Sequence, residues 1–87
     1  MKYEFCWTPA ARRALRSIPQ YDAIRLLTAL TLLGDDPYRR EGVDVKALTG
    51  RPGFRLRVGN YRLVYEVDDG KLVILVVTAG HRRDIYE

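Results

Sequence analysis

Three arginines stand where a β-hairpin would bring them to one surface. Arg55 and Arg57 alternate with apolar residues before the turn pair Gly59-Asn60, and Arg62 follows that pair. A two-residue loop at Gly59-Asn60 sets the strand register by counting outward, so Arg57 directly opposes Arg62. Opposed like charges cost a hairpin up to about 1 kcal/mol, and a polyanion lying across them relieves that repulsion. The spacing therefore predicts a phosphate-binding face.

A solvated sheet face is the alternative explanation of the same arginines. Their side chains would then extend into water or pair with Glu66 and the acidic residues of a neighbouring loop. Arg82 and Arg83 follow the last predicted strand and add two more cations to the cluster. Because arginine clusters bind phosphate well, the two added cations favour the anion-binding interpretation.

The segment Gly80-His81-Arg82-Arg83-Asp84-Ile85-Tyr86 is too polar to continue the core and holds further reactive groups. A tyrosine such as Tyr86 can stack on a base while neighbouring arginines hold phosphates. Histidine is the residue type suited to proton transfer at neutral pH, so His81 is a candidate acid or base. A hydrogen-bonded surface histidine is the plain alternative for His81.

The elements that must position these groups follow from hydrophobic periodicity. Alternating apolar residues over 3–7 predict a first strand. Thr8 is the expected N-cap of a helix with Pro9 at its first position, and Pro19 ends or kinks that helix. A second helix follows and ends at Gly34, so the two helices form a hairpin.

A polar connection over residues 34–53 leads from the helices to the rest of the sheet. The sheet continues as a three-stranded antiparallel meander, whose strands cover residues 54–58, 61–67 and 72–79. Asp69-Gly70 is expected to form a second two-residue turn. The predicted fold class is α+β, with an N-terminal strand, a helical hairpin and then the meander.

Composition limits the classes of function. The 87 residues, 47% of them hydrophobic, suffice for one packed domain. One cysteine and one histidine argue against an internal disulfide and a structural zinc site, so no metal or cofactor is predicted. No apolar stretch reaches about 20 residues and the N-terminus lacks a signal-peptide pattern, so we expect a cytoplasmic protein.

The basic residues are biased toward arginine. The net charge is +4, and only three of the 15 basic residues are lysines. The planar, always-charged guanidinium suits phosphate contacts, although a GC-rich genome produces the same bias.

Three stretches together form a recognisable pattern. They are Lys46-Ala47-Leu48, the run from Phe54 to Tyr65 with its Tyr-Arg-Leu-Val-Tyr strand, and the run from Val77 to Tyr86 with its Gly-His-Arg-Arg-Asp-Ile-Tyr tail. With them the chain resembles the RelE/ParE toxin superfamily over essentially its whole length. The resemblance implies a RelE-like microbial RNase-type fold, with residues 1–87 as a single RelE-like toxin domain.

The resemblance also implies a function. RelE-like members are the toxins of type II toxin–antitoxin systems and act as ribosome-dependent mRNA endoribonucleases, which inhibits translation. The 2′-hydroxyl of the RNA attacks the adjacent phosphate and no metal is required. The implied partners are a cognate antitoxin and mRNA on the ribosome, with operator DNA reached only through the antitoxin. A toxin–antitoxin heterotetramer is compatible with this reading, and no membrane partner is expected.

Residue roles follow from the matching motif positions. By this resemblance Arg62 stabilises charge on the scissile phosphate, Arg82 acts on the leaving group or the phosphate, and Tyr86 stacks on a substrate base. Arg55 and Arg57 fall where family members carry lysines, one of which is the general base. An arginine stays protonated, so Arg57 is a poor base and the catalytic activity is expected to be weak unless another group serves.

His81 is the alternative acid or base that the sequence offers. The remaining basic residues of the pattern are assigned to RNA binding, namely Lys46, Arg51, Arg55 and Arg83. Two other functions stay open. One is a ParE-like inhibitor of DNA gyrase, which needs the fold but no catalytic groups, and the other is a weakly catalytic toxin that acts mainly as an antitoxin-bound transcriptional corepressor.

The antitoxin is expected to bring an acidic helix or strand across the basic face. The exposed edge of the first strand and the grooves beside the helix pair are candidate docking surfaces.

Overall fold

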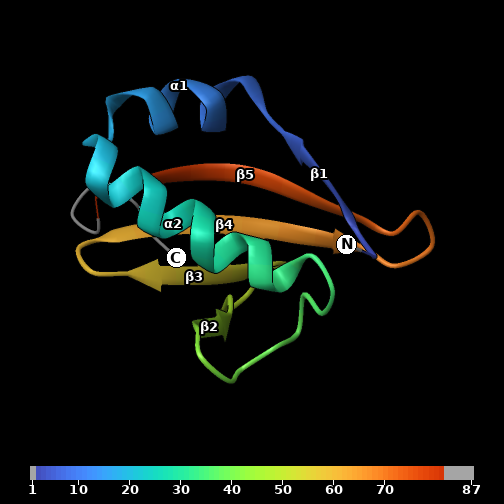
Figure 1. Ribbon diagram of the computed structural model, residues 1–87. Helices are drawn as coiled ribbons and strands as arrows, with labels where there is room; N and C mark the ends of the chain where they lie inside the picture. The colour runs from blue at the N-terminus through green and yellow to red at the C-terminus, as the bar shows by residue number, and fades with distance from the viewer. Residues whose placement is uncertain (1, 82–87) are drawn as a thin grey trace.

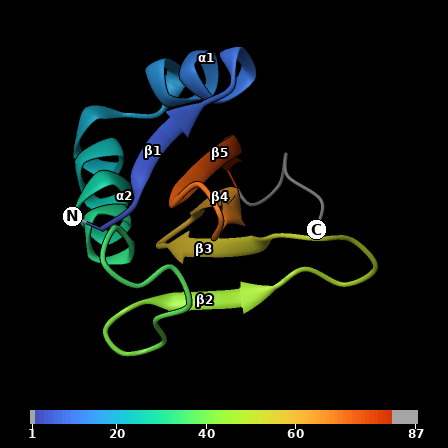
Figure 2. The ribbon, with the colours of Figure 1, turned by 90° about the vertical axis from the view of Figure 1, so that its right-hand side faces the viewer.

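A five-stranded sheet with two helices on one face forms the described part of the protein, residues 2–81 of the computed structural model (Figures 1 and 2). The elements in chain order are β1 (Glu4–Trp7), α1 (Pro9–Ser17), α2 (Gln20–Leu33), β2 (Asp44–Ala47), β3 (Phe54–Val58), β4 (Tyr61–Asp68) and β5 (Val73–His81). None of the helices in this range is long and apolar enough to span a lipid bilayer.

The strand order is β1-β5-β4-β3-β2, with β1 parallel to β5 and every other neighbouring pair antiparallel. The helical hairpin is the connection between β1 and the rest of the sheet, α1 lies on β5, and α2 lies on β3 and β4 (Figure 2). The predicted α+β class, the N-terminal strand, the helical hairpin and the meander of β3, β4 and β5 are confirmed.

The predicted long connection was incomplete, because it contains β2. Four residues alternate there as Asp44-Val45-Lys46-Ala47, and they pair antiparallel with β3 over its first four positions. Val45 turns to the core and is buried, while Asp44 and Lys46 face solvent. A strand this short carries little periodic signal of its own and forms because β3 offers a free edge to pair with.

The helix boundaries follow from local chemistry. Thr8 caps α1: its Oγ1 accepts a hydrogen bond from the Ala11 backbone N–H at 3.0 Å and donates one to the Val77 carbonyl at 2.6 Å. Pro9 stands at the first helical position, and Pro19 separates the two helices. The predicted cap and break points are therefore confirmed, and the Thr8 hydroxyl also ties α1 to β5.

The two turns of the meander differ. Gly59-Asn60 joins β3 to β4 with Gly59 at φ +59°, as the sequence predicts. The Asp69-Gly70 prediction was wrong, because β4 ends at Asp68 and β5 begins only at Val73. The Asp68 carboxylate accepts a hydrogen bond from the Lys71 backbone N–H at 3.0 Å, which stabilises this wider four-residue loop.

The core lies between the sheet and the helices. Leu26, Leu30 and Leu33 of α2 pack in one cluster with Leu56 of β3 and Leu63 of β4. Both of these strand leucines are fully buried. Their alternation leaves the intervening residues of β3 and β4 on the other face of the sheet.

Asp69 joins three separate segments through its carboxylate. The Tyr3 hydroxyl donates to Oδ1 and the Tyr38 hydroxyl donates to Oδ2, each at 2.5 Å. These two hydrogen bonds lower the pKa of Asp69, and the bond to Asp69 raises the pKa of Tyr3 to about 12. The β4–β5 loop is thereby tied to the start of the chain and to the segment after α2.

We expect Asp69→Asn to lower the melting temperature at neutral pH, because an amide cannot replace an ionised carboxylate between two phenols. The pKa of Asp69 is lower in the folded protein than in the unfolded chain, so its ionised carboxylate stabilises the fold above the unfolded pKa of about 3.9. This stabilisation is lost as the pH falls below that value. The difference in melting temperature between wild type and Asp69→Asn should therefore become smaller below about pH 4. Thermal melts followed by circular dichroism at several pH values measure this difference, and Glu66→Gln serves as the control. A difference in melting temperature that does not depend on pH would contradict an ionised Asp69 carboxylate.

Candidate nucleic-acid interface

The face of the sheet that points away from the helices carries the candidate site. The register puts two rows of residues across it, Asp44–Arg57–Arg62–Gly80 and Lys46–Arg55–Val64–Thr78. Residues that are direct cross-strand partners share a face with Cβ atoms about 4.5–5.5 Å apart. We call the surface formed by Lys46, Arg55, Arg57 and Arg62 the basic face. Its cations come from three neighbouring strands: Lys46 from β2, Arg55 and Arg57 from β3, and Arg62 from β4.

The predicted opposition of Arg57 and Arg62 is confirmed by the register of β3 and β4. Both side chains are partly exposed. The turn at Gly59 fixes their pairing, and the buried leucines on the opposite face prevent a shift by one residue. Two like charges are thus held face to face by the packing beneath them.

Arg55 is more deeply placed than its neighbours, with 7% of the residue exposed. Its Nη2 lies 3.2 Å from Oδ1 of Asp44, whose side chain is 56% exposed. Sequence reasoning missed Asp44, because it treated residues 34–53 as a connection. The alternation of Asp44, Val45 and Lys46 was the available signal for a strand that presents a carboxylate beside the arginines.

Lys46 and Arg51 are exposed cations of the segment that leads into β3. Lys46 is exposed on β2 directly across from Arg55. Arg51 is exposed in the loop before β3, which a hydrogen bond from the Leu48 N–H to the Gly53 carbonyl closes at 3.0 Å. Gly53 has φ +115°, and a Cβ there would meet the Tyr65 carbonyl oxygen at 3.0 Å, so the loop requires glycine at this position.

His81 is not brought together with these arginines. It is the last residue of β5 and the cross-strand partner of Tyr61, with ring centroids 5.4 Å apart in an edge-on arrangement. Tyr61 precedes Arg62 on β4, so Tyr61 and His81 lie on the opposite face of the sheet. Arg82, Arg83 and Tyr86, the other tail residues assigned a role, lie outside the described residues.

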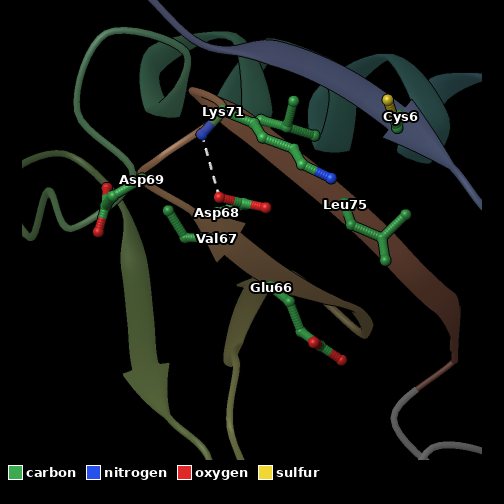
Figure 3. A pocket seen from close by; sticks show the side chains of 8 residues that line it. Cys6, Glu66, Val67, Asp68, Asp69, Lys71 and Leu75 are labelled. Atoms are coloured by element: carbon green, nitrogen blue, oxygen red, sulfur yellow. Dashed lines mark hydrogen bonds between the residues drawn. The ribbon is translucent and has the colours of Figure 1, made fainter.

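The charge of the side chains on this outer face changes from positive to negative along β4. Beyond Arg62 and Val64 come Glu66 and Asp68, which border an open hollow of about 620 Å³ between β4, β5 and β1 (Figure 3). Its other lining residues are Cys6, Val67, Asp69, Lys71, Val73 and Leu75. Within residues 2–81, no group of three or more His, Cys, Asp or Glu side chains is placed to hold a metal ion. The cations of the basic face and the carboxylates Glu66 and Asp68 thus lie at different positions on the same outer face.

Comparison with known proteins shows which protein family this chain belongs to. A sequence profile described as the ParE toxin of the type II toxin–antitoxin system parDE matches residues 6–86. Toxin RelG of Mycobacterium tuberculosis is 33% identical over 91 residues, which cover 99% of this chain and 98% of that protein. This chain belongs to the RelE/ParE toxin superfamily and is a toxin of a type II toxin–antitoxin system.

Solved structures agree with this assignment. A chain of the archaeal RelE–RelB complex from Pyrococcus horikoshii superposes with a TM-score of 0.82 at 30% identity, covering 98% of this chain and 100% of that one. The E. coli RelBE toxin–antitoxin complex contains a chain with a TM-score of 0.77 at 27% identity, covering 91% and 95%. The resemblance to RelE-like toxins that the sequence indicates is confirmed at the level of fold and superfamily.

We expect Arg57→Gln to weaken binding of single-stranded RNA and to lower its salt dependence. Loss of one phosphate contact reduces the slope of log K against log salt by about 0.7. Fluorescence anisotropy with a labelled oligonucleotide at several salt concentrations measures both quantities. Arg13→Gln is the matched control, because it removes the same charge from an exposed position on α1. Equal effects of the two variants would contradict a localised RNA-binding face.

Proposed function

We propose that this toxin is a ribosome-dependent mRNA endoribonuclease. The observation that carries the proposal is the convergence of Lys46, Arg55, Arg57 and Arg62 on one sheet face. Within it, Arg57 and Arg62 face each other across neighbouring strands, an arrangement of like charges that is unfavourable in a hairpin. An RNA phosphate between them would turn the repulsion into two charge-assisted contacts.

The reaction divides into tasks that this face can perform. The 2′-hydroxyl must be aligned with the adjacent phosphate, its proton removed, and the extra negative charge of the transition state stabilised. Arg62, at the centre of the sheet, is the residue assigned to the charge on the phosphate. Arg57 stands where relatives carry a lysine and stays protonated, so it adds charge stabilisation and does not remove the proton.

Two groups of the tail complete the proposed site. Arg82 is assigned to the leaving oxygen or the phosphate, and Tyr86 to stacking on a substrate base. Both assignments rest on their positions in the Gly-His-Arg-Arg-Asp-Ile-Tyr segment. Arg51, Arg55 and Arg83 are assigned to binding the RNA backbone. The structure gives His81 a place on the other face beside Tyr61, which does not support a direct catalytic role for it.

We expect Arg62→Ala to reduce mRNA cleavage by about 100- to 1,000-fold, the usual cost of removing one group that stabilises transition-state charge. Primer extension on mRNA from a cell-free translation extract measures the cleavage and shows whether it requires ribosomes. Arg13→Ala, on the exposed side of α1, should cleave as wild type does. Full activity of Arg62→Ala, with its fold confirmed by circular dichroism, would refute the assignment.

The proposed protein partner is a cognate antitoxin. The related toxins of P. horikoshii and E. coli have both been crystallised as complexes with RelB antitoxins. In this chain α2 presents exposed apolar side chains, with Tyr21 72%, Ile24 54% and Leu32 41% exposed. Exposed apolar side chains along one helix suit a protein interface. We therefore assign part of the antitoxin contact to this helix.

We expect Ile24→Asp to weaken antitoxin binding at least about tenfold, which corresponds to about 1.4 kcal/mol. The cause would be an unpaired charge placed in an apolar contact. Isothermal titration calorimetry with the antitoxin measures it, and RNA cleavage by the free toxin should not change. Ser17→Asp adds the same charge at an exposed position at the end of α1 and serves as the control.

Inhibition of DNA gyrase is the second candidate function, and the ParE description of the matching family favours it. It requires a binding surface and no proton transfer. Loss of gyrase supercoiling activity with intact mRNA in the translation extract would select this function over RNA cleavage.

A further inference from the structure

Asp44 occupies an unusual position for a carboxylate on a phosphate-binding surface. It is the direct cross-strand partner of Arg57, and its Oδ1 lies 3.2 Å from Nη2 of Arg55. More than half of the Asp44 side chain is nevertheless exposed, so a ligand on the basic face can reach it. A carboxylate here repels phosphate and lowers the affinity for RNA. Its placement therefore has no explanation in binding alone.

The proposed reaction requires a proton acceptor, and the described residues of the basic face offer few. In the two cross-strand rows, Asp44 is the one carboxylate among residues 2–81. Arginine cannot accept a proton at neutral pH, and the cationic form of Lys46 cannot accept one either. His81 lies on the other face with Tyr61. Glu66 lies farther along β4, at the hollow.

We propose that Asp44 is the general base of the cleavage reaction, an inference that rests on the proposed endoribonuclease function. An Asp44 carboxylate oxygen takes the proton of the 2′-hydroxyl while the 2′-oxygen forms its bond to phosphorus. The bond from phosphorus to the 5′-oxygen breaks, and that oxygen keeps the electron pair and takes a proton from water. The products are a 2′,3′-cyclic phosphate and a 5′-hydroxyl, and Asp44 returns its proton to solvent.

The neighbouring arginines would prepare Asp44 for this step. Arg55 is buried, so its guanidinium is held by packing and fixes the orientation of the carboxylate it contacts. It acts as a positioning residue. Arg57 lies on the adjacent strand, where it can hold the phosphate close to the carboxylate that activates the nucleophile. Cross-strand partners lie close enough for one RNA phosphodiester to contact both, so the base would act beside the group that holds the phosphate.

The test compares Asp44→Asn with wild type in single-turnover cleavage of mRNA on programmed ribosomes. Asparagine keeps the shape and the acceptor oxygen for Arg55 but cannot take a proton. We expect the cleavage rate constant to fall about 100- to 10,000-fold, the range for loss of a general base. Binding of a 2′-O-methyl RNA, which cannot be cleaved, should not weaken and should tighten slightly, because the charge that repels phosphate is removed. Asp44→Glu should retain partial activity and an acid limb in its pH–rate profile.

Asp68→Asn removes a carboxylate from the hollow at the far end of the same face and should cleave as wild type does. Cleavage by Asp44→Asn at the wild-type rate would overturn the assignment and leave the proposed function intact. Loss of 2′-O-methyl RNA binding in step with cleavage would also overturn it, because Asp44 would then be structural. Wild-type protein that leaves mRNA intact would overturn the proposed function and this inference together.

Discussion

The register of the β3–β4 hairpin is the constraint on which the rest of the structure depends. Gly59 adopts a positive φ, and the two-residue turn that it forms aligns Leu56 with Leu63 and Arg57 with Arg62. A slip of one residue would send the arginines into the core and the leucines into water. The hairpin therefore defines the hydrophobic core and the basic face in a single step, and neither can change without the other.

The energies involved explain why a repulsive pair of arginines is tolerated. Burial of one leucine side chain contributes about 1.5–3 kcal/mol, while opposed like charges on a hairpin cost up to about 1 kcal/mol. Two fully buried leucines beneath the pair outweigh its repulsion. The α2 leucines that close the core thus indirectly hold the cations of the outer face in place. The described core cluster lies mainly on the helix side of the sheet, so the partly exposed positions of Arg57 and Arg62 on the outer face can carry charged residues.

The parts of the fold that sequence reasoning predicted are those with strong local signals. Thr8-Pro9 marks the start of α1, and Gly59-Asn60 marks the hairpin with its register. The prediction of a two-residue turn between β4 and β5 was wrong because groups distant in sequence shape this loop. The hydroxyls of Tyr3 and Tyr38 donate hydrogen bonds to the Asp69 carboxylate. β2 was missed because its pairing with β3, and not its own four residues, stabilises it.

His81 shows how one irregularity changes a site. Between the pairs Tyr65–Val76 and Val64–Thr78 the register shifts by one residue at a β-bulge. Without that shift His81 would share a face with Arg62, as its assignment as a catalytic residue required. With the shift, Gly80 faces Arg62 and His81 faces Tyr61. A bulge leaves no dependable mark in a continuous apolar strand, so counting along the sequence could not have revealed it.

The charge pattern of the outer face then bears on how a substrate lies there. Arg55 and Arg57 on β3 and Arg62 near the start of β4 form one end of this face, and Glu66 and Asp68 border the hollow at the far end of β4. In the proposed RNA complex, phosphates are attracted to the arginine end of the face and repelled from the acidic end, which limits where the RNA lies. Asp44 is the exception to this separation, since its carboxylate lies inside the basic region and contacts Arg55. A carboxylate that opposes the prevailing charge, remains accessible and is held by a buried arginine has the properties required of a proton acceptor more than those of a binding residue.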